Sequence, residues 1–552
     1  MKELRVFGPP GTGKTTRLAE RIETAAKKYG SDNVLVSSFT RAAAREIASR
    51  GIPVDKQNVG TLHSLCYHAL DCPDIAEGHL DEFSKEYPRF ALSGTGGKTV
   101  ENPLKETTAA MATRGDALIQ QMGNLRARMI PVEMWPSLVR AFHKAWLKWK
   151  QDSWYKDFAD LIDLGIENLE TAPGRPSVGI LDESQDFSRH QMTLVRQWAK
   201  NFEYVLFGGD PDQLLYNFAG ATPDAFLEPP IPEKQKEVLA QSFRVPRAIH
   251  CVAEKWISQI KKREPTEYLP RDFEGEATFS RGNISNPRLF MDEVEHWTKD
   301  EGETVMILAP CAYMLQATIT LLREKGLPFH NPYRKINGAW NPLQRRKNAK
   351  MAIDRLTAFT TPTHGFPPVW SMFEIATFIW HMRAKGTVVR GAKNLPSQYV
   401  KDGVEMPESF GNDYREMLLS FFEADTTDKL MEQLEQGPDA HWFFEQILST
   451  KRGLYRFPLK VLDKQGEAGL VELPKIIVGT AHSTKGGESD NVIFSPDLSL
   501  AGMREWAQKG QGRDAIIRMT YVAMTRAKKR LRILRPAGSF HVDFSRVKGL
   551  LQ

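Results

Sequence analysis

The sequence contains few cysteines, and their spacing argues against two kinds of stabilising site. It has four in 552 residues, at Cys66, Cys72, Cys251 and Cys311. They are too few and too scattered for a disulfide framework, and no two form a C-x-x-C pair, so we expect no zinc or iron–sulfur site. The 13 histidines form no H-x-x-x-H pair, so we predict no structural metal ion. This composition fits a reducing intracellular compartment.

The sequence also lacks a long apolar run. No stretch approaches the roughly 18 residues that a membrane-spanning helix needs, so we expect no membrane partner. The first apolar run already begins at Leu4, which leaves no room for a signal peptide, and we therefore expect a cytoplasmic protein. Short-period repeats and low-complexity tracts are absent as well.

Neither sign of charge dominates. The chain carries 74 Lys and Arg against 68 Asp and Glu, a net charge of +6, with 41% hydrophobic residues. This is typical of a globular protein of about three or four domains, and it permits nucleic-acid binding without arguing for it. The basic clusters at residues 261–263 and 345–347 are interpreted as solvated surface rather than phosphate sites.

One segment, residues 8–15, predicts a phosphate-binding loop. It reads G-P-P-G-T-G-K-T and matches G-x-x-x-x-G-K-[ST] at every fixed position. An apolar run precedes it and a helix-compatible segment, residues 16–29, follows, which is the strand–loop–helix context that the motif requires. Backbone N–H groups and the helix N-terminus can hold phosphate oxygens there. The predicted nucleotide ligands are Gly8, Pro9, Pro10, Gly11, Thr12, Gly13, Lys14, Thr15 and Thr16.

Two acidic segments follow later strands. Residues 180–186 read I-L-D-E-S-Q-D, in which Asp182 can hold Mg²⁺ together with the Thr15 hydroxyl, and Glu183 can deprotonate the attacking water. Residues 208–213 read G-G-D-P-D-Q, in which Gln213 can sense the γ-phosphate. The sequence thus predicts hydrolysis of a nucleoside triphosphate with Mg²⁺ as cofactor.

Residues from later in the chain extend this site. Arg244 and Arg526 are candidates for an arginine that reaches the γ-phosphate from a second domain. Tyr216 and Phe218, just after Gln213, can stack on bases, a contact worth about 1–3 kcal/mol per base without sequence preference.

Alternating strand and helix signals predict an α/β fold with parallel sheets, in two blocks that each carry a mostly helical insertion. The helix expected around Trp146 and Trp149 is interpreted as amphipathic, with its tryptophans in the core rather than on DNA. The predicted strands lie at residues 4–7, 33–39, 58–61, 178–181, 204–207, 304–309, 475–478 and 531–534.

Taken in order, these motifs resemble those of superfamily 1 DNA helicases of the UvrD/Rep/PcrA type, from residue 8 to residue 527. Residues 182–186 resemble D-E-x-Q-D, and residues 210–221 resemble G-D-D-D-Q-S-I-Y-x-W-R-G-A. The other similar segments are residues 38–46 (F-T-N-x-A-A-x-E), 60–64 (T-F-H-S), 157–162 (D-F-D-D-L), 241–244 (N-Y-R-S), 479–488 (T-x-H-x-x-K-G-L-E) and 518–527 (R-x-x-Y-V-A-x-T-R-A).

The resemblance implies two RecA-like motor domains that face each other across an ATP cleft. Their expected bounds are 1–65 with 155–240 (domain 1A) and 241–335 with 466–552 (domain 2A), with helical insertions at 66–154 (1B) and 336–465 (2B). The cleft would be lined by Lys14, Thr15, Asp182, Glu183, Gln213, Arg244 and Arg526, with Glu488 as a further nucleotide ligand. Single-stranded DNA would contact Phe39, Thr40, Thr61, His63, Tyr216, Phe218 and His482.

The resemblance further implies an ATP-dependent 3′→5′ translocase and helicase acting on single-stranded DNA and on junctions of single- and double-stranded DNA. One alternative is a superfamily 1 motor of 5′→3′ polarity, which Leu214 after Gln213 favours but the Q-D of residues 185–186 opposes. Another is a nucleotide switch with DNA-stimulated ATPase activity and no processive unwinding. Seven residues precede Gly8, so we expect the family's adenine-reading Q motif to be missing or replaced.

Overall fold

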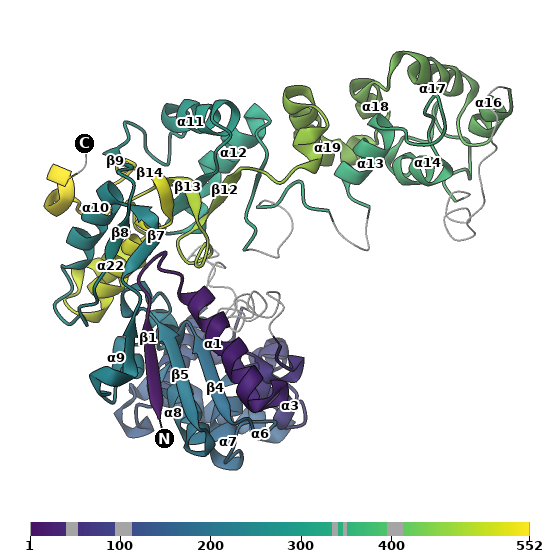
Figure 1. Ribbon diagram of the computed structural model, residues 1–552. Coiled ribbons are helices and arrows are strands. Elements are labelled where there is room, and N and C mark those ends of the chain that lie inside the picture. Colours follow the sequence, from purple (N-terminus) through teal and green to yellow (C-terminus); the bar gives the residue numbers. More distant parts are fainter. Residues whose placement is uncertain are drawn as a thin grey trace. The chain divides into compact units, whose positions relative to one another are not determined.

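The computed structural model describes residues 2–39, 53–93, 113–333, 340–345, 350–394 and 412–550. They form two compact units, one built from Met1–Gln316 and Gly479–Gln552 and the other from Ala317–Val478 (Figure 1). Most of the segment at residues 38–46, including Thr40, lies outside the described residues, as does most of the basic cluster at 345–347. The four-domain bounds stay a prediction.

The first unit begins with a six-stranded sheet in the order β3-β2-β4-β5-β1-β6, and its registered neighbours are parallel. Its strands are β1 (Glu3–Phe7), β2 (Val34–Ser38), β3 (Val59–Gly60), β4 (Val178–Asp182), β5 (Tyr204–Gly209) and β6 (Lys236–Val238).

Apolar side chains leave both faces of this sheet, which explains why its central strands read as continuous apolar runs. Val34 and Val36 pack with Leu18 and Ile22 of α1 (Lys14–Tyr29), which lies over β4 and β5 in Figure 1. Leu35 points the other way, into a core formed with the helices α3 (Leu62–Ala69), α7 (Phe158–Asn168) and α8 (Arg189–Trp198).

A helical insertion separates β3 from β4. It contains α4 (Leu80–Glu86), α5 (Arg114–Ala127) and α6 (Ser137–Ser153) and has its own aromatic core. Trp146 and Trp149 of α6 are buried in that core, so the interpretation of these tryptophans as core residues is confirmed.

The rest of the first unit repeats the α/β pattern, with parallel strands in the order β10-β13-β14-β9. These are β9 (Glu276–Phe279), β10 (Val305–Ala309), β13 (Ser489–Phe494) and β14 (Ala527–Ile533). Two short strands, β7 (Gln241–Pro246) and β8 (Leu269–Arg271), pair with each other. The accompanying helices are α9 (Pro223–Leu227), α10 (Arg247–Ile257), α11 (Arg288–Glu295), α21 (Leu500–Ala507) and α22 (Gln511–Met524).

The second unit is mostly helical, as predicted, around a core that includes Phe359, Trp370, Phe378 and Phe443. Among the described residues of this unit, β11 (Phe329–His330) pairs with β12 (Ile476–Thr480), whose last two residues belong to the first unit. Its helices are α12 (Gln316–Lys325), α13 (Ala352–Thr360), α14 (Met372–Phe378), α16 (Asn412–Leu419), α17 (Ala424–Gln436), α18 (Ala440–Gln446), α19 (Ser449–Gln465) and α20 (Ala468–Val471).

Every predicted strand coincides with an observed one, and the α/β class with parallel sheets is confirmed. Within the described ranges, no helix combines the length and the apolar character that crossing a membrane would require.

Candidate nucleotide and DNA site

The predicted phosphate loop connects β1 to α1 in a conformation that depends on its glycines. Gly11 and Gly13 have φ angles of +77° and +80°, in the left-handed region. A Cβ on Gly11 would lie 2.4 Å from Cβ of Arg244, so a larger residue does not fit there. No side chain caps α1, which begins directly after Gly13. Its first N–H groups are thus available to an anion.

Residues of β7, and Tyr268 just before β8, hold the loop. They belong to the part of the first unit that contains β7–β10, β13 and β14, which we call the second α/β half; the first half contains β1–β6. Ser242 Oγ and Tyr268 Oη each donate to the Pro10 carbonyl at 2.9 Å, and the Phe243 N–H donates to the Gly11 carbonyl at 2.8 Å. Sequence reasoning missed Ser242 and Tyr268, because their role depends on contacts with residues more than 200 positions away. The loop is therefore fixed by both halves of the first unit.

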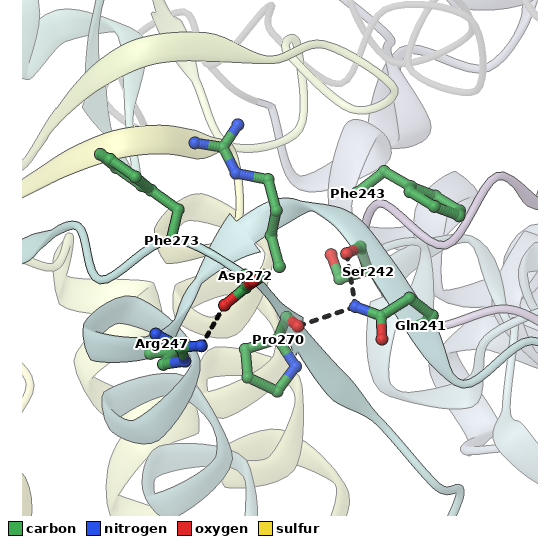
Figure 2. A pocket seen from close by; sticks show the side chains of 8 residues that line it. Gln241, Ser242, Phe243, Arg247, Pro270, Asp272 and Phe273 are labelled. Atoms are coloured by element: carbon green, nitrogen blue, oxygen red, sulfur yellow. Dashed lines mark hydrogen bonds and ion pairs between the residues drawn. The ribbon is translucent and has the colours of Figure 1, made fainter.

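An open pocket of about 620 Å³ lies beside these bracing residues (Figure 2). In Figure 2 the Gln241 amide points to the Pro270 carbonyl, and Arg247 pairs with Asp272. The ring of Phe243 is 70% exposed, and a Cβ on Gly13 would lie 4.0 Å from it. An exposed aromatic ring next to the phosphate loop provides a stacking surface for a nucleobase.

Lys14 contacts both predicted catalytic acids. Its Nζ lies 2.5 Å from Asp182 Oδ1 and 2.6 Å from Glu183 Oε1, and the Lys14 side chain is 8% exposed. Burial alone would lower the pKa of Lys14, but the two carboxylates raise it above its ordinary value. The lysine is therefore charged and pairs with both acids.

The donors predicted for Mg²⁺ are also adjacent. Thr15 Oγ1 donates to Asp182 Oδ2 at 3.3 Å, at the carboxyl end of β4. One hydroxyl and one carboxylate suit Mg²⁺, which completes its octahedron with water and substrate phosphates. Among the residues that the structure describes, no cluster of three or more His, Cys, Asp or Glu is arranged for a metal ion.

Lys485, to which the sequence assigned no role, is a second cation at the acids. Its Nζ lies 2.8 Å from Glu183 Oε2 and forms a closer ion pair with Asp186. Although burial favours the neutral acid, Lys14 and Lys485 hold the pKa of Glu183 well below its ordinary value. A lysine in the segment resembling T-x-H-x-x-K-G was the available signal, but the sequence alone did not name its partners.

The predicted γ-phosphate sensor, Gln213, contacts one of the two predicted arginines, Arg526. Arg526 NH2 donates to Gln213 Oε1 at 2.8 Å, and Gln213 Nε2 donates to Asp210 Oδ2 at 2.8 Å. Arg526 is 2% exposed and also donates to the Gly487 carbonyl at 3.1 Å. Burial, reinforced by Asp212, raises the pKa of Asp210 to about 7.

Arg244 and Glu488, predicted as separate nucleotide contacts, form an ion pair with an Nε to Oε2 distance of 2.8 Å. Lys528 also contacts Glu488, at 3.0 Å. Thr16 is exposed in the first turn of α1. Arg244 lies against Gly11 of the phosphate loop, so its position fits a nucleotide contact even though its present partner is an acid.

Four of the predicted DNA residues form a continuous row of rings. Ring centroids lie 4.6 Å apart for Phe39 and Tyr216, 5.7 Å for Tyr216 and Phe218, and 5.8 Å for Phe218 and His482. Burial, with a smaller effect of Lys485, lowers the pKa of His482 to about 4. Its ring is therefore neutral at pH 7 and offers a stacking face.

The other predicted DNA residues lie differently. His63 lines a cavity of about 150 Å³ together with Phe39 and Phe218. Thr61 uses its hydroxyl to cap α3, accepting from the Ser64 N–H at 3.2 Å. Thr40 lies outside the described residues. Contacts of all these residues with DNA stay a prediction.

Comparison with known proteins points to the same class. Residues 2–219 match the AAA domain family. ATP-dependent DNA helicase PcrA of Bacillus subtilis is 27% identical over 399 residues, which are 65% of this chain and 51% of that protein. PcrA of Staphylococcus aureus (strain Mu50) is 26% identical over 362 residues, or 61% of this chain and 49% of that protein.

The chain spans about half the length of the curated relatives it matches. The matched AAA domain contains the phosphate loop, both acids and Gln213. These matches confirm the predicted resemblance: the chain is similar to ATP-dependent DNA helicases of the PcrA type, and residues 2–219 match the AAA domain family.

Proposed function

We propose that this protein is an ATP-dependent DNA helicase that moves 3′→5′ along single-stranded DNA. The observation that carries the proposal is the convergence of Lys485 and Arg526, from the second α/β half, on Glu183 and Gln213 of the first half. Hydrolysis at such a site depends on how closely the two halves approach each other.

Each residue of the site has its own proposed role in ATP hydrolysis. Lys14 would exchange the acids for the β- and γ-phosphates, and Glu183 would then be free to take a proton from the attacking water. Gln213 and Arg526 would stabilise the charge that develops on the γ-phosphate. Mg²⁺, held by Thr15 and Asp182, would neutralise phosphate charge when bound.

The proposed base site is the exposed ring of Phe243. Stacking on a ring reads the flat face that every nucleobase has, so this contact by itself selects weakly among nucleotides. We therefore propose ATP as the substrate on the strength of the relatives' names and expect a modest preference over GTP.

The row of rings from Phe39 to His482 is the proposed path for single-stranded DNA. Stacking on consecutive rings holds bases without reading their sequence, as a translocase requires. Tyr216 lies in this row, and its ring is 5.5 Å from Nζ of Lys485, which pairs with Glu183. A shift of this row of rings on DNA binding would thus move Lys485 and change its ion pair with Glu183. We also propose the four domains 1A, 1B, 2A and 2B, with the bounds predicted above. Junctions of single- and double-stranded DNA are proposed as further substrates.

The test compares unwinding of duplexes with a 3′ or a 5′ single-stranded tail, alongside DNA-stimulated ATP hydrolysis. Unwinding from the 3′ tail alone is expected. Unwinding from the 5′ tail alone supports the opposite polarity, and stimulated hydrolysis without unwinding supports a nucleotide switch. Lys14→Ala is expected to abolish hydrolysis, whereas Lys27→Ala, at an exposed lysine of the same helix, serves as the matched control. Full activity of Lys14→Ala would contradict the proposal.

A further inference from the structure

Gln185 is a buried glutamine placed between the catalytic acid and the sensor segment. It is 0% exposed and lies in the short turn Ser184–Asp186 that follows β4. Its Nε2 donates to Glu183 Oε2 at 2.7 Å, and its Oε1 accepts from the Asp210 N–H at 3.1 Å. One side chain therefore connects the ends of two neighbouring strands.

We propose that Gln185 is a positioning residue, which aims the Glu183 carboxylate and ties it to the Gln213 segment. The inference rests on the proposed function only in that Glu183 is taken as the base for ATP hydrolysis. It requires neither movement on DNA nor unwinding.

Glu183 depends on its contacts because its backbone is strained. Its φ of 53° places it in the left-handed region, where a residue with a side chain is strained. Its other partners are two lysines, Lys14 and Lys485. Lys14 leaves when phosphate binds, and Lys485 belongs to the other α/β half. Gln185 is a neutral partner in the turn that directly follows Glu183, so neither phosphate binding nor separation of the two halves removes its bond.

The other end of Gln185 reaches the sensor through one residue. The Asp210 N–H contacts Gln185, while Asp210 Oδ2 accepts from Gln213 Nε2 at 2.8 Å. Gln213 in turn accepts from Arg526. Space around the amide is tight, since a Cβ on Gly209 would lie 2.8 Å from Gln185 Oε1. A displacement of Gln213 by the γ-phosphate is therefore transmitted to the orientation of Glu183.

The experiment measures ATP hydrolysis of Gln185→Met and Gln185→Glu in the full chain, with and without a dT oligonucleotide. Methionine keeps the length of the side chain and removes both hydrogen bonds. Glutamate keeps the acceptor for Asp210 N–H but faces Glu183 with a like charge. Misplacement of a catalytic group by about 1 Å can cost about a hundredfold in rate. We expect kcat to fall tenfold to a hundredfold in both variants, with KM for ATP within twofold of the wild type.

Gln197→Met is the matched control, because Gln197 is a partly buried glutamine of α8 whose Nε2 donates to the Ile166 carbonyl at 2.7 Å, away from Glu183. It is expected to keep kcat. The inference is overturned if Gln185→Met keeps kcat within threefold, or if its loss appears only in KM or equals that of Gln197→Met. A wild type that hydrolyses ATP but does not unwind DNA refutes the proposed helicase and leaves this inference standing, whereas a wild type without hydrolysis refutes both.

Discussion

Replacing Lys485 by methionine tests whether charge pairs with Glu183 and Asp186 help to hold the two α/β halves together. Lys485 is largely buried against Glu183 and Asp186, with the ring of Tyr216 nearby. Burial would lower the pKa of Lys485, but the carboxylates raise it above its ordinary value, so the lysine is charged. Lys485→Met leaves Glu183 with Lys14 and leaves Asp186 without a cation.

The expected cost follows from the charge left behind. Removing one partner of a buried ion pair costs about 3–5 kcal/mol of unfolding free energy. Asp186 can escape this cost by binding a proton, because burial already raises its pKa to about 6. Its native pKa lies above the unfolded value of 3.8, so the native state binds the proton more tightly and lowering the pH favours it. We expect a loss of about 3–5 kcal/mol at pH 8 and about 1–2 kcal/mol at pH 5.5.

Urea unfolding of the wild type and the variant at both pH values measures this loss. The double variant Lys485→Met with Asp186→Asn removes both charges and is expected within about 1.5 kcal/mol of the wild type. Lys255→Met, at an exposed lysine of α10, controls for the substitution itself. A change below about 0.5 kcal/mol at both pH values, or a loss that does not depend on pH, would refute this reasoning.

Three further predictions concern other parts of the first unit. Burial, together with Asp157, raises the pKa of Glu77 to about 8 from 4.5, so the native state binds a proton more tightly than the unfolded state does. Its contribution to the free energy of unfolding is therefore lost as the pH rises from about 4.5 to about 8, a loss of at most about 5 kcal/mol. Glu77→Gln should accordingly raise the melting temperature at pH 8 more than at pH 5. Arg526→Lys should lower kcat for ATP hydrolysis by about 10³-fold or more with little change in nucleotide affinity, because lysine cannot reproduce the two guanidinium contacts to Gln213 and Gly487. Steady-state hydrolysis and nucleotide titration measure the two quantities, and a change in affinity alone would contradict this prediction. Phe218→Ala should weaken binding of a dT oligonucleotide by about 1–3 kcal/mol, measured by fluorescence anisotropy, and leave ATP affinity unchanged. If the variant binds the oligonucleotide as tightly as the wild type, the row of rings is not the path of the DNA.

The sequence by itself determined the elements and the chemistry near each strand end. Apolar runs at residues 33–39 and 178–181 predicted buried parallel strands, and both were found, because burial on two faces leaves a local pattern. The phosphate loop and the acids Asp182 and Glu183 were recognisable because their ligands require fixed residue types at fixed short spacing. The tryptophans of α6 were likewise placed correctly by helical periodicity.

Only the tertiary structure decided which distant residues meet. Lys485 finds Glu183 across 302 positions, and Ser242 and Tyr268 find the carbonyl of Pro10, because strand order and chain crossovers bring these segments together. Arg244 was predicted to face a phosphate and is found on Glu488, a partner set by the fold. Gln185 lies within a recognised motif, yet its role follows from the neighbouring strand that carries Asp210. Periodicity and spacing encode local geometry, whereas the pairing of charges far apart in the chain depends on topology, which no short pattern records.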